Sequence, residues 1–103
     1  MSYTKRQLIS YGMDRLLIET YFVEEDGGMY VCAFCVCGIR PQAAVVAYNR
    51  IAHDLMDFAH KAMRRGNSKG YATAISFLSD AIFALKQADA AHKENMKSRE
   101  VKP

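Results

Sequence analysis

Three cysteines within six positions form the densest group of reactive side chains in this sequence. The stretch MYVCAFCVCG covers residues 29–38 and contains Cys32, Cys35 and Cys37. A Cys-x-x-Cys pair is typical of zinc and thiol-redox sites, but zinc takes four ligands and the histidines lie far along the chain. In an extended strand Cys32 and Cys35 point to opposite faces and cannot chelate one ion. We therefore expect buried thiols, and a metal-binding or redox protein using all three cysteines is an alternative.

A second group of possible ligands follows helical spacing. His53, Asp57 and His60 stand at i, i+4 and i+7, so they share one face of a helix. That geometry could hold a metal or seat a general base. The simpler interpretation is a solvated polar face on which Asp57 pairs with Lys61, because a surface trio lacks supporting groups. We expect no metal and no cofactor, and the sequence leaves open whether this face binds anything.

Basic residues gather at one turn of the chain. Arg64, Arg65 and Lys69 surround the start of a predicted helix, where free N–H groups and the helix dipole attract anions. The alternative is that these side chains complete the end of the preceding helix. The candidate partner- or anion-binding residues are Arg64, Arg65 and Lys69, together with Tyr11 and Phe83, whose grounds are given below.

The sequence has no complete catalytic motif. It shows no paired base, no nucleophile with a nearby histidine and no glycine-rich phosphate loop after a strand, so we expect a non-enzymatic protein. With 103 residues, half of them apolar, the sequence fits one domain, and its formal charge of +3 is too mild to imply non-specific nucleic-acid binding without a local cluster. We expect residues 1–92 to form this domain and 93–103 a frayed or disordered tail.

The cellular compartment follows from what the sequence lacks. An odd number of cysteines in one short run argues for a reducing compartment. The first residues contain no apolar core of a signal peptide, and no apolar run approaches the roughly 20 residues of a membrane span. We expect a cytoplasmic protein without a membrane partner, in the host cell if the chain is phage-encoded.

The hydrophobic pattern predicts five elements of secondary structure. Residues 4–17 have helical spacing, and residues 42–65 and 69–95 predict two long helices joined by a turn short enough to make them antiparallel. Asp26-Gly27 is a type I′ turn signal between strands at 18–24 and 29–37. Because the second strand is apolar on both faces, we expect cover on both sides. The predicted fold class is α+β, order α-β-β-α-α, with a β-hairpin packed on a long antiparallel helical hairpin.

Apolar residues outside the main helical stripes are the best functional clue. They include Val46, Met56, Phe77 and Phe83, and such residues point to an interface, either of a homo-oligomer or with another protein. An ordinary α+β core is the alternative explanation. Asp80 is the one carboxylate among these apolar positions, either a satisfied polar group or an interface contact. The predicted stripes are Ala44, Tyr48, Ile51, Leu55, Phe58, Ala59 and Ala62, then Tyr71, Ile75, Leu78, Ile82, Leu85 and Ala88.

The helical pair carries a local resemblance to a known group of proteins. YNRIAHDLMDF, a polar turn and ATAISFLSDAIFALKQADAA share a pattern of small and apolar residues, carried by Ser76, Leu78, residues 81–85 and Ala88. This pattern resembles the C-terminal helical hairpin of small phage anti-CBASS and anti-Thoeris proteins, which sequester cyclic nucleotides without degrading them. The resemblance covers residues 44–91, and the cysteine-rich hairpin at 16–37 departs from the all-helical version of that family.

The resemblance and the surface clues together predict a function. The resemblance implies an oligomer with ligand pockets between subunits, in which Tyr11, Arg64, Arg65 and Lys69 would meet bases and phosphates. We expect a phage or mobile-element protein that evades immunity by occupying a host defence protein complex or nucleic-acid-binding protein, as anti-CRISPR proteins do. The alternative is an oligomeric sponge for cyclic nucleotides. The inhibitor needs one contiguous apolar and charged face, whereas the sponge needs a closed pocket where cations and a ring converge.

Overall fold

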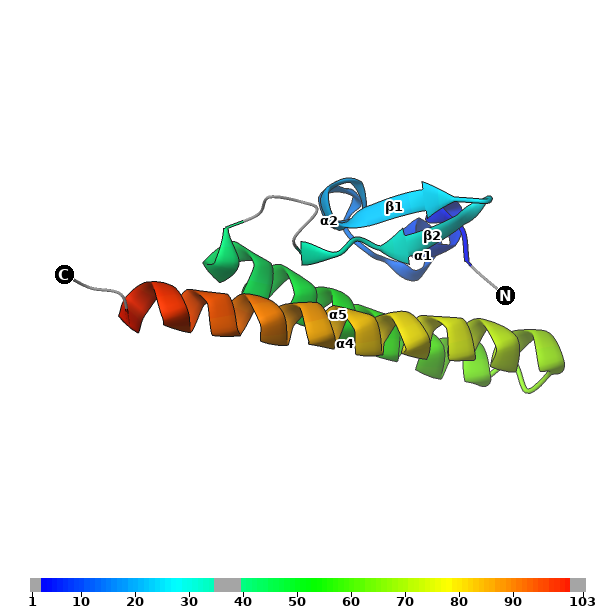
Figure 1. The fold of residues 1–103 in the computed structure, drawn as a ribbon. Helices are drawn as coiled ribbons and strands as arrows, with labels where there is room; N and C mark the ends of the chain where they lie inside the picture. Colours follow the sequence, from blue (N-terminus) through cyan, green and yellow to red (C-terminus); the bar gives the residue numbers. More distant parts are fainter. Residues whose placement is uncertain (1–2, 35–39, 101–103) are drawn as a thin grey trace.

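The structure is a computed structural model that describes residues 3–34 and 40–100, with side chains placed up to residue 97. Two long antiparallel helices carry a small N-terminal lobe on one side (Figure 1). This arrangement confirms the predicted α+β fold and the order α-β-β-α-α. The elements are α1 (Lys5–Tyr11), α2 (Arg15–Tyr21), β1 (Phe22–Glu25), β2 (Gly28–Val31), α4 (Pro41–Met63) and α5 (Ser68–Glu100).

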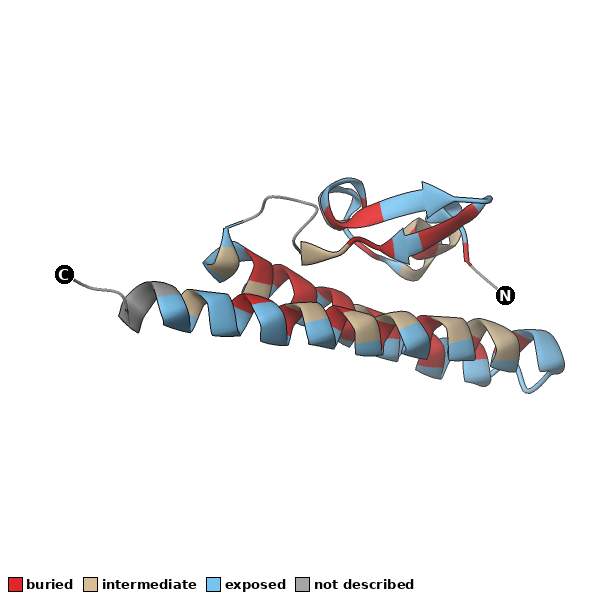
Figure 2. Cartoon of the chain, in the orientation of Figure 1, coloured by how far each residue is buried: buried red, intermediate tan, exposed pale blue. Residues whose placement is uncertain are grey.

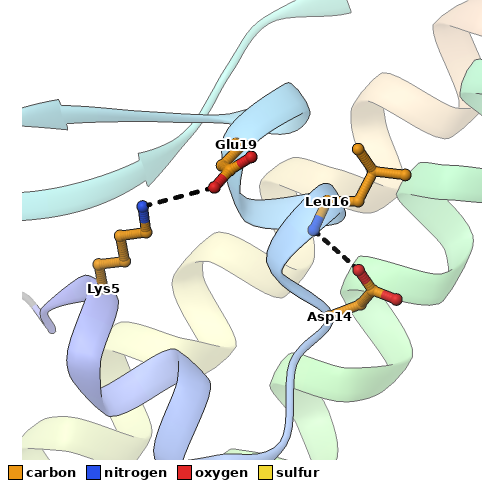
Figure 3. A network of polar contacts seen from close by, with 4 residues as sticks. All are labelled: Lys5, Asp14, Leu16 and Glu19. Carbon is orange, nitrogen blue, oxygen red and sulfur yellow. Dashed lines mark hydrogen bonds and ion pairs between the residues drawn. The ribbon is translucent and has the colours of Figure 1, made fainter.

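The first predicted helix is two helices, because the chain breaks at Gly12. Thr4 begins α1 with a capping box, in which its side chain and that of Gln7 each accept a backbone N–H. Gly12 then adopts a left-handed conformation, with φ at 106°, that ends α1. Asp14 begins α2 by accepting the Leu16 N–H at 2.8 Å (Figure 3). The single helix predicted over residues 4–17 is therefore wrong.

The β-hairpin has the predicted turn but shorter strands. Asp26 and Gly27 have φ values of 50° and 76°, the two positive angles that a type I′ turn requires. Residues 18–21, predicted as strand, belong to α2. The second strand ends at Val31, so its predicted extent of 29–37 is wrong for residues 32–34, and residues 35–37 lie outside the described part. Within this chain the helices do not cover both faces of the strand, because Tyr30 is 42% exposed, and cover by another subunit stays a prediction.

The α4 helix buries the stripe that its sequence predicts. Its seven predicted core residues are all buried. The short turn that follows is formed by Gly66, whose φ is 65°, and by Asn67, whose side chain caps α5 by accepting the Gly70 N–H at 2.8 Å. Both features fix the antiparallel return of the chain.

The α5 helix buries a different face from the one predicted. Of the predicted stripe only Ala88 is buried, and its five large members are exposed by 38–64%. The face against α4 is made mainly of small side chains, and Figure 2 shows it as the buried band between the two helices. Small residues let α5 approach the large side chains of α4, so shape outweighs hydrophobicity in setting the rotation of the helix. The buried residues are Ala74, Phe77, Ala81, Ala84, Ala88 and Ala91.

The C-terminal end of α5 extends beyond the predicted helix. It runs to Glu100, so residues 93–100 are helical where the sequence indicated a frayed tail, and residues 101–103 lie outside the described part. Within the described residues, no helix is both long and apolar enough to cross a membrane.

An aromatic cluster joins the N-terminal lobe to the helical hairpin. Phe77 is fully buried, and its ring lies 4.7 Å from that of Tyr3, 5.4 Å from that of Tyr11 and 5.8 Å from that of Phe58, between centroids. Aromatic pairs at these separations stabilise the fold beyond the area that they bury. The cluster fixes α1 and the preceding Tyr3 against both long helices.

Gly70 permits the closest approach at the helical turn. A Cβ atom added there would lie 2.5 Å from the Ala62 carbonyl oxygen, which is part of the backbone of α4 and cannot swing away. We expect Gly70→Ala to lower the free energy of unfolding by about 1 kcal/mol, because the clash outweighs the helix propensity gained. Urea denaturation with Ala72→Gly as a second helix variant tests this, and a stabilised Gly70→Ala protein would contradict the packing at this turn.

Candidate binding groove

Two adjoining hollows form one groove between the β-hairpin and α5. Their volumes are about 470 Å³ and 580 Å³, and both are lined by Tyr30, Ser79 and Asp80. We call this combined feature the hairpin groove. The first hollow adds Tyr3, Met29, Ile75 and Ser76, and the second adds Val23, Glu25, Val31, Cys32, Ala33 and Phe83.

The wall of the second hollow is largely apolar, whereas the first hollow is about equally polar and apolar. Val23 and Tyr30 face each other in the register of the hairpin, and they are 43% and 42% exposed. They lie on the sheet face opposite Phe22 and Val31, which are buried in the core. Phe83 contributes the α5 side of the wall and is half-buried. Such a combination of rings and aliphatic groups is typical of a binding site for another apolar surface.

Asp80 is the charged centre of the groove. The Tyr3 hydroxyl, whose residue is 1% exposed, donates a hydrogen bond to the Asp80 carboxylate. Burial raises the pKa of Asp80, and the hydrogen bond from Tyr3 opposes that rise. Burial also raises the pKa of Tyr3, and its hydrogen bond to Asp80 adds to the effect. Within the described part of the chain, no lysine or arginine forms an ion pair with Asp80.

The end of β2 is held in place by contacts to both long helices. The Tyr48 hydroxyl on α4 donates to the Cys32 carbonyl oxygen at 2.7 Å, and the Phe34 N–H donates to Gln87 Oε1 on α5 at 2.6 Å. Cys32 itself is buried, which confirms the expected burial for this thiol. Cys35 and Cys37 lie outside the described residues. The described residues contain no group of three side chains arranged to hold a metal ion.

The structure distributes the five predicted partner-binding residues over three places. Arg64, Arg65 and Lys69 are exposed at the tip of the helical hairpin. Tyr11 stacks on Phe58 at 5.3 Å between ring centroids and belongs to the aromatic cluster. Only Phe83 lines the hairpin groove. The structure therefore does not bring the candidate cations and rings together.

The histidine face of α4 is solvated. His53, Asp57 and His60 are exposed, and Asp57 forms the predicted ion pair with Lys61 at 3.2 Å between carboxylate oxygen and Nζ. An exposed i,i+4 pair of this kind contributes only about 0.3–0.5 kcal/mol.

Sequence reasoning missed most of the groove. Tyr3, Val23 and Tyr30 were not singled out, because no local pattern places them beside α5. Asp80 was the one member with a signal, since it is the only carboxylate among the apolar positions of its helix. Its hydrogen-bond partner stands 77 residues away in the chain.

Comparisons with known proteins add no relative. The sequence matches no protein-family model, and no curated protein or solved structure is significantly similar to it. The resemblance to phage nucleotide-sequestering proteins therefore stays a prediction, and the functional argument depends on the geometry of the chain.

Proposed function

We propose that this chain is a non-enzymatic binding protein whose hairpin groove holds an apolar segment of a partner protein, with a lysine or arginine of that segment against Asp80. The observation that carries the proposal is a half-buried carboxylate, without a cationic partner among the described residues, between apolar walls. Glu25 lines the same groove and adds a second negative charge.

The energetics of Asp80 favour a cationic occupant. Partial burial has already removed water from the carboxylate, so a charge-assisted hydrogen bond from a partner recovers interaction that the free protein lacks. Val23, Tyr30 and Phe83 would cover the aliphatic stem of the incoming side chain, and the two rings can also contact its charge. The same carboxylate repels phosphate, so nothing in the groove favours a cyclic nucleotide as its ligand.

The wider role is the one that the sequence predicts, an inhibitor that occupies a host defence complex. The support for it is a groove with an apolar wall and a carboxylate at its centre, which suits a partner protein. The groove is acidic, whereas the sequence led us to expect a basic contact surface. Inhibition of a defence complex itself stays a prediction.

A peptide titration followed by heteronuclear NMR tests the proposal. The probe is the blocked tripeptide acetyl-Leu-Arg-Leu-amide, and acetyl-Leu-Glu-Leu-amide is its charge-reversed control. We expect the arginine peptide to shift the amide signals of Tyr30, Asp80 and Phe83 and the glutamate peptide to leave them in place. Asp80→Asn, which keeps an acceptor for Tyr3, should weaken arginine-peptide binding about 10-fold or more, as expected for the loss of a charged contact of 1.5–3 kcal/mol.

The outcome that contradicts the proposal is equally specific. Equal shifts with the two peptides, shifts located outside the groove, or unchanged binding by Asp80→Asn would each show that the groove does not select a cationic apolar segment.

A further inference from the structure

A second apolar surface lies on α5 and adjoins the hairpin groove, with which it shares Ile75. Its large side chains Tyr71, Ile75, Leu78, Ile82 and Leu85 follow one another at intervals of four, three, four and three residues. Each is between 38% and 64% exposed. We call these five residues the outer stripe. Such spacing is the heptad pattern by which one helix packs along another, and α4 occupies a different face of α5.

The neighbouring side of α4 extends this surface. Val45 and Asn49 share a hollow with Leu85 and Ala88, so this side of α4 adjoins the outer stripe, and Asp89 and His92 border the hollow where the apolar stripe ends. Counting along α4 from Val45 at alternating intervals of four and three residues reaches Met56 and Met63. These two side chains are 43% and 38% exposed. No lysine, arginine, aspartate or glutamate occupies the α4 positions of this series or the outer stripe. Loss of charge is what distinguishes the core of a protein interface from ordinary surface.

We propose that the outer stripe pairs with the outer stripe of a second copy of this chain, so that two helical hairpins form a four-helix bundle. The surface approaches the size of a small dimer interface. From Val45 to Met63 it spans about 27 Å at about 1.5 Å per residue, and two adjacent helices make it about 20 Å wide. The flat projection of this surface measures about 500 Å², and its side chains give it a larger accessible area. For comparison, specific interfaces bury about 800 Å² per partner.

The pattern of side chains fits a second copy in particular. Ile75 and Ile82 occupy one heptad position, and Leu78 and Leu85 occupy the other, so the stripe offers regular aliphatic layers for packing along a second helix. A twofold interface places the same patch on both sides, so any charge near its axis would meet a like charge. The outer stripe has none, and its aliphatic residues are complementary to themselves.

Sedimentation velocity and native mass spectrometry over a concentration series test this pairing. We expect a dimer for the wild-type protein and a monomer for Ile82→Glu, because two carboxylates would be buried in one interface. The dissociation constant should rise at least about 30-fold, which corresponds to the loss of a central interface residue. Val46→Glu is the matched control, because Val46 is 70% exposed on α4 outside this surface, and it should leave the dimer intact.

Several results would overturn the pairing. They are a wild-type monomer at every concentration, a dimer that survives Ile82→Glu, or one that Val46→Glu disrupts equally. Leu85→Lys gives an independent disruption in case the first variant folds poorly. Since Ile82 does not line the hairpin groove, a monomeric Ile82→Glu protein should still bind the arginine tripeptide, which separates this proposal from the proposed function.

Discussion

Replacing Phe77 by alanine is expected to lower the free energy of unfolding by about 3–5 kcal/mol, the usual cost of emptying a buried aromatic site. Phe77 is fully buried and contacts the rings of Tyr3, Tyr11 and Phe58. The cavity would lie where the N-terminal lobe meets both long helices, so little can collapse to fill it. Urea denaturation followed by circular dichroism gives the measurement.

Leu78→Ala is the matched control for Phe77→Ala. Leu78 follows Phe77 directly but is 38% exposed on the outer stripe. We expect its loss to cost less than about 1 kcal/mol in the monomer, because little buried contact disappears. Both substitutions should be made in the Ile82→Glu background, so that self-association does not contribute. A larger loss for Leu78→Ala than for Phe77→Ala would mean that α5 is rotated as its hydrophobicity alone predicts.

Tyr3→Phe is expected to lower the free energy of unfolding by about 1–2 kcal/mol near neutral pH. The change removes the hydroxyl that donates to Asp80 and leaves a half-buried carboxylate without that donor. Hydrogen bonds to charged groups contribute about 1.5–3 kcal/mol, and solvent at the half-exposed carboxylate reduces the value. A double-mutant cycle with Asp80→Asn isolates the pair. Absence of coupling between the two positions would show that this hydrogen bond does not form.

The pH dependence of stability supplies a second test of Asp80. Burial raises the pKa of its carboxyl above the ordinary value of 3.8, so the folded protein holds this proton when the unfolded chain has released it. The contribution of Asp80 to the free energy of unfolding is therefore greatest below pH 3.8, and it is lost as the pH rises through the raised pKa. Asp80→Asn should remove this loss of stability with rising pH, and it keeps an acceptor for the Tyr3 hydroxyl. An unchanged pH profile in the variant would contradict the burial of the carboxylate.

Local signals in the sequence predicted the helical hairpin well. In α4 the large apolar residues stand on one face and charged residues on the other, so periodicity alone identifies the core. Gly66 and Asn67 then specify the turn, because one accepts a positive φ and the other caps the next helix. These signals depend only on neighbours in the chain, which is why they could be read from the sequence.

The rotation of α5 was not predictable from hydrophobicity. This helix contains two heptad stripes, one of large side chains and one mainly of alanine, and the large stripe has the stronger apolar signal. The choice between them depends on the shape of α4, whose face already carries Tyr48, Ile51 and Leu55. Alanines allow the two helices to pack closely, and that complementarity exists only in three dimensions.

The hairpin groove was also beyond sequence reasoning, because it is made by the position of the N-terminal lobe. That position depends on the break at Gly12 and on Asp14, which begins a second helix where the pattern indicated only one. The lobe places Tyr3 beside α5, and an ion pair of Lys5 on α1 with Glu19 on α2, at 3.9 Å, joins the two short helices (Figure 3).

Both proposals depend on one structural claim, that α5 turns its small residues toward α4 and its large ones outward. Hydroxyl-radical footprinting read by mass spectrometry tests it directly in the monomeric Ile82→Glu protein. The structure predicts strong oxidation of Tyr71, Leu78 and Leu85, and protection of Phe77 although a phenyl ring is intrinsically reactive. Oxidised Phe77 together with protected Leu78 and Leu85 would contradict the claim, and with it both the hairpin groove and the dimer interface.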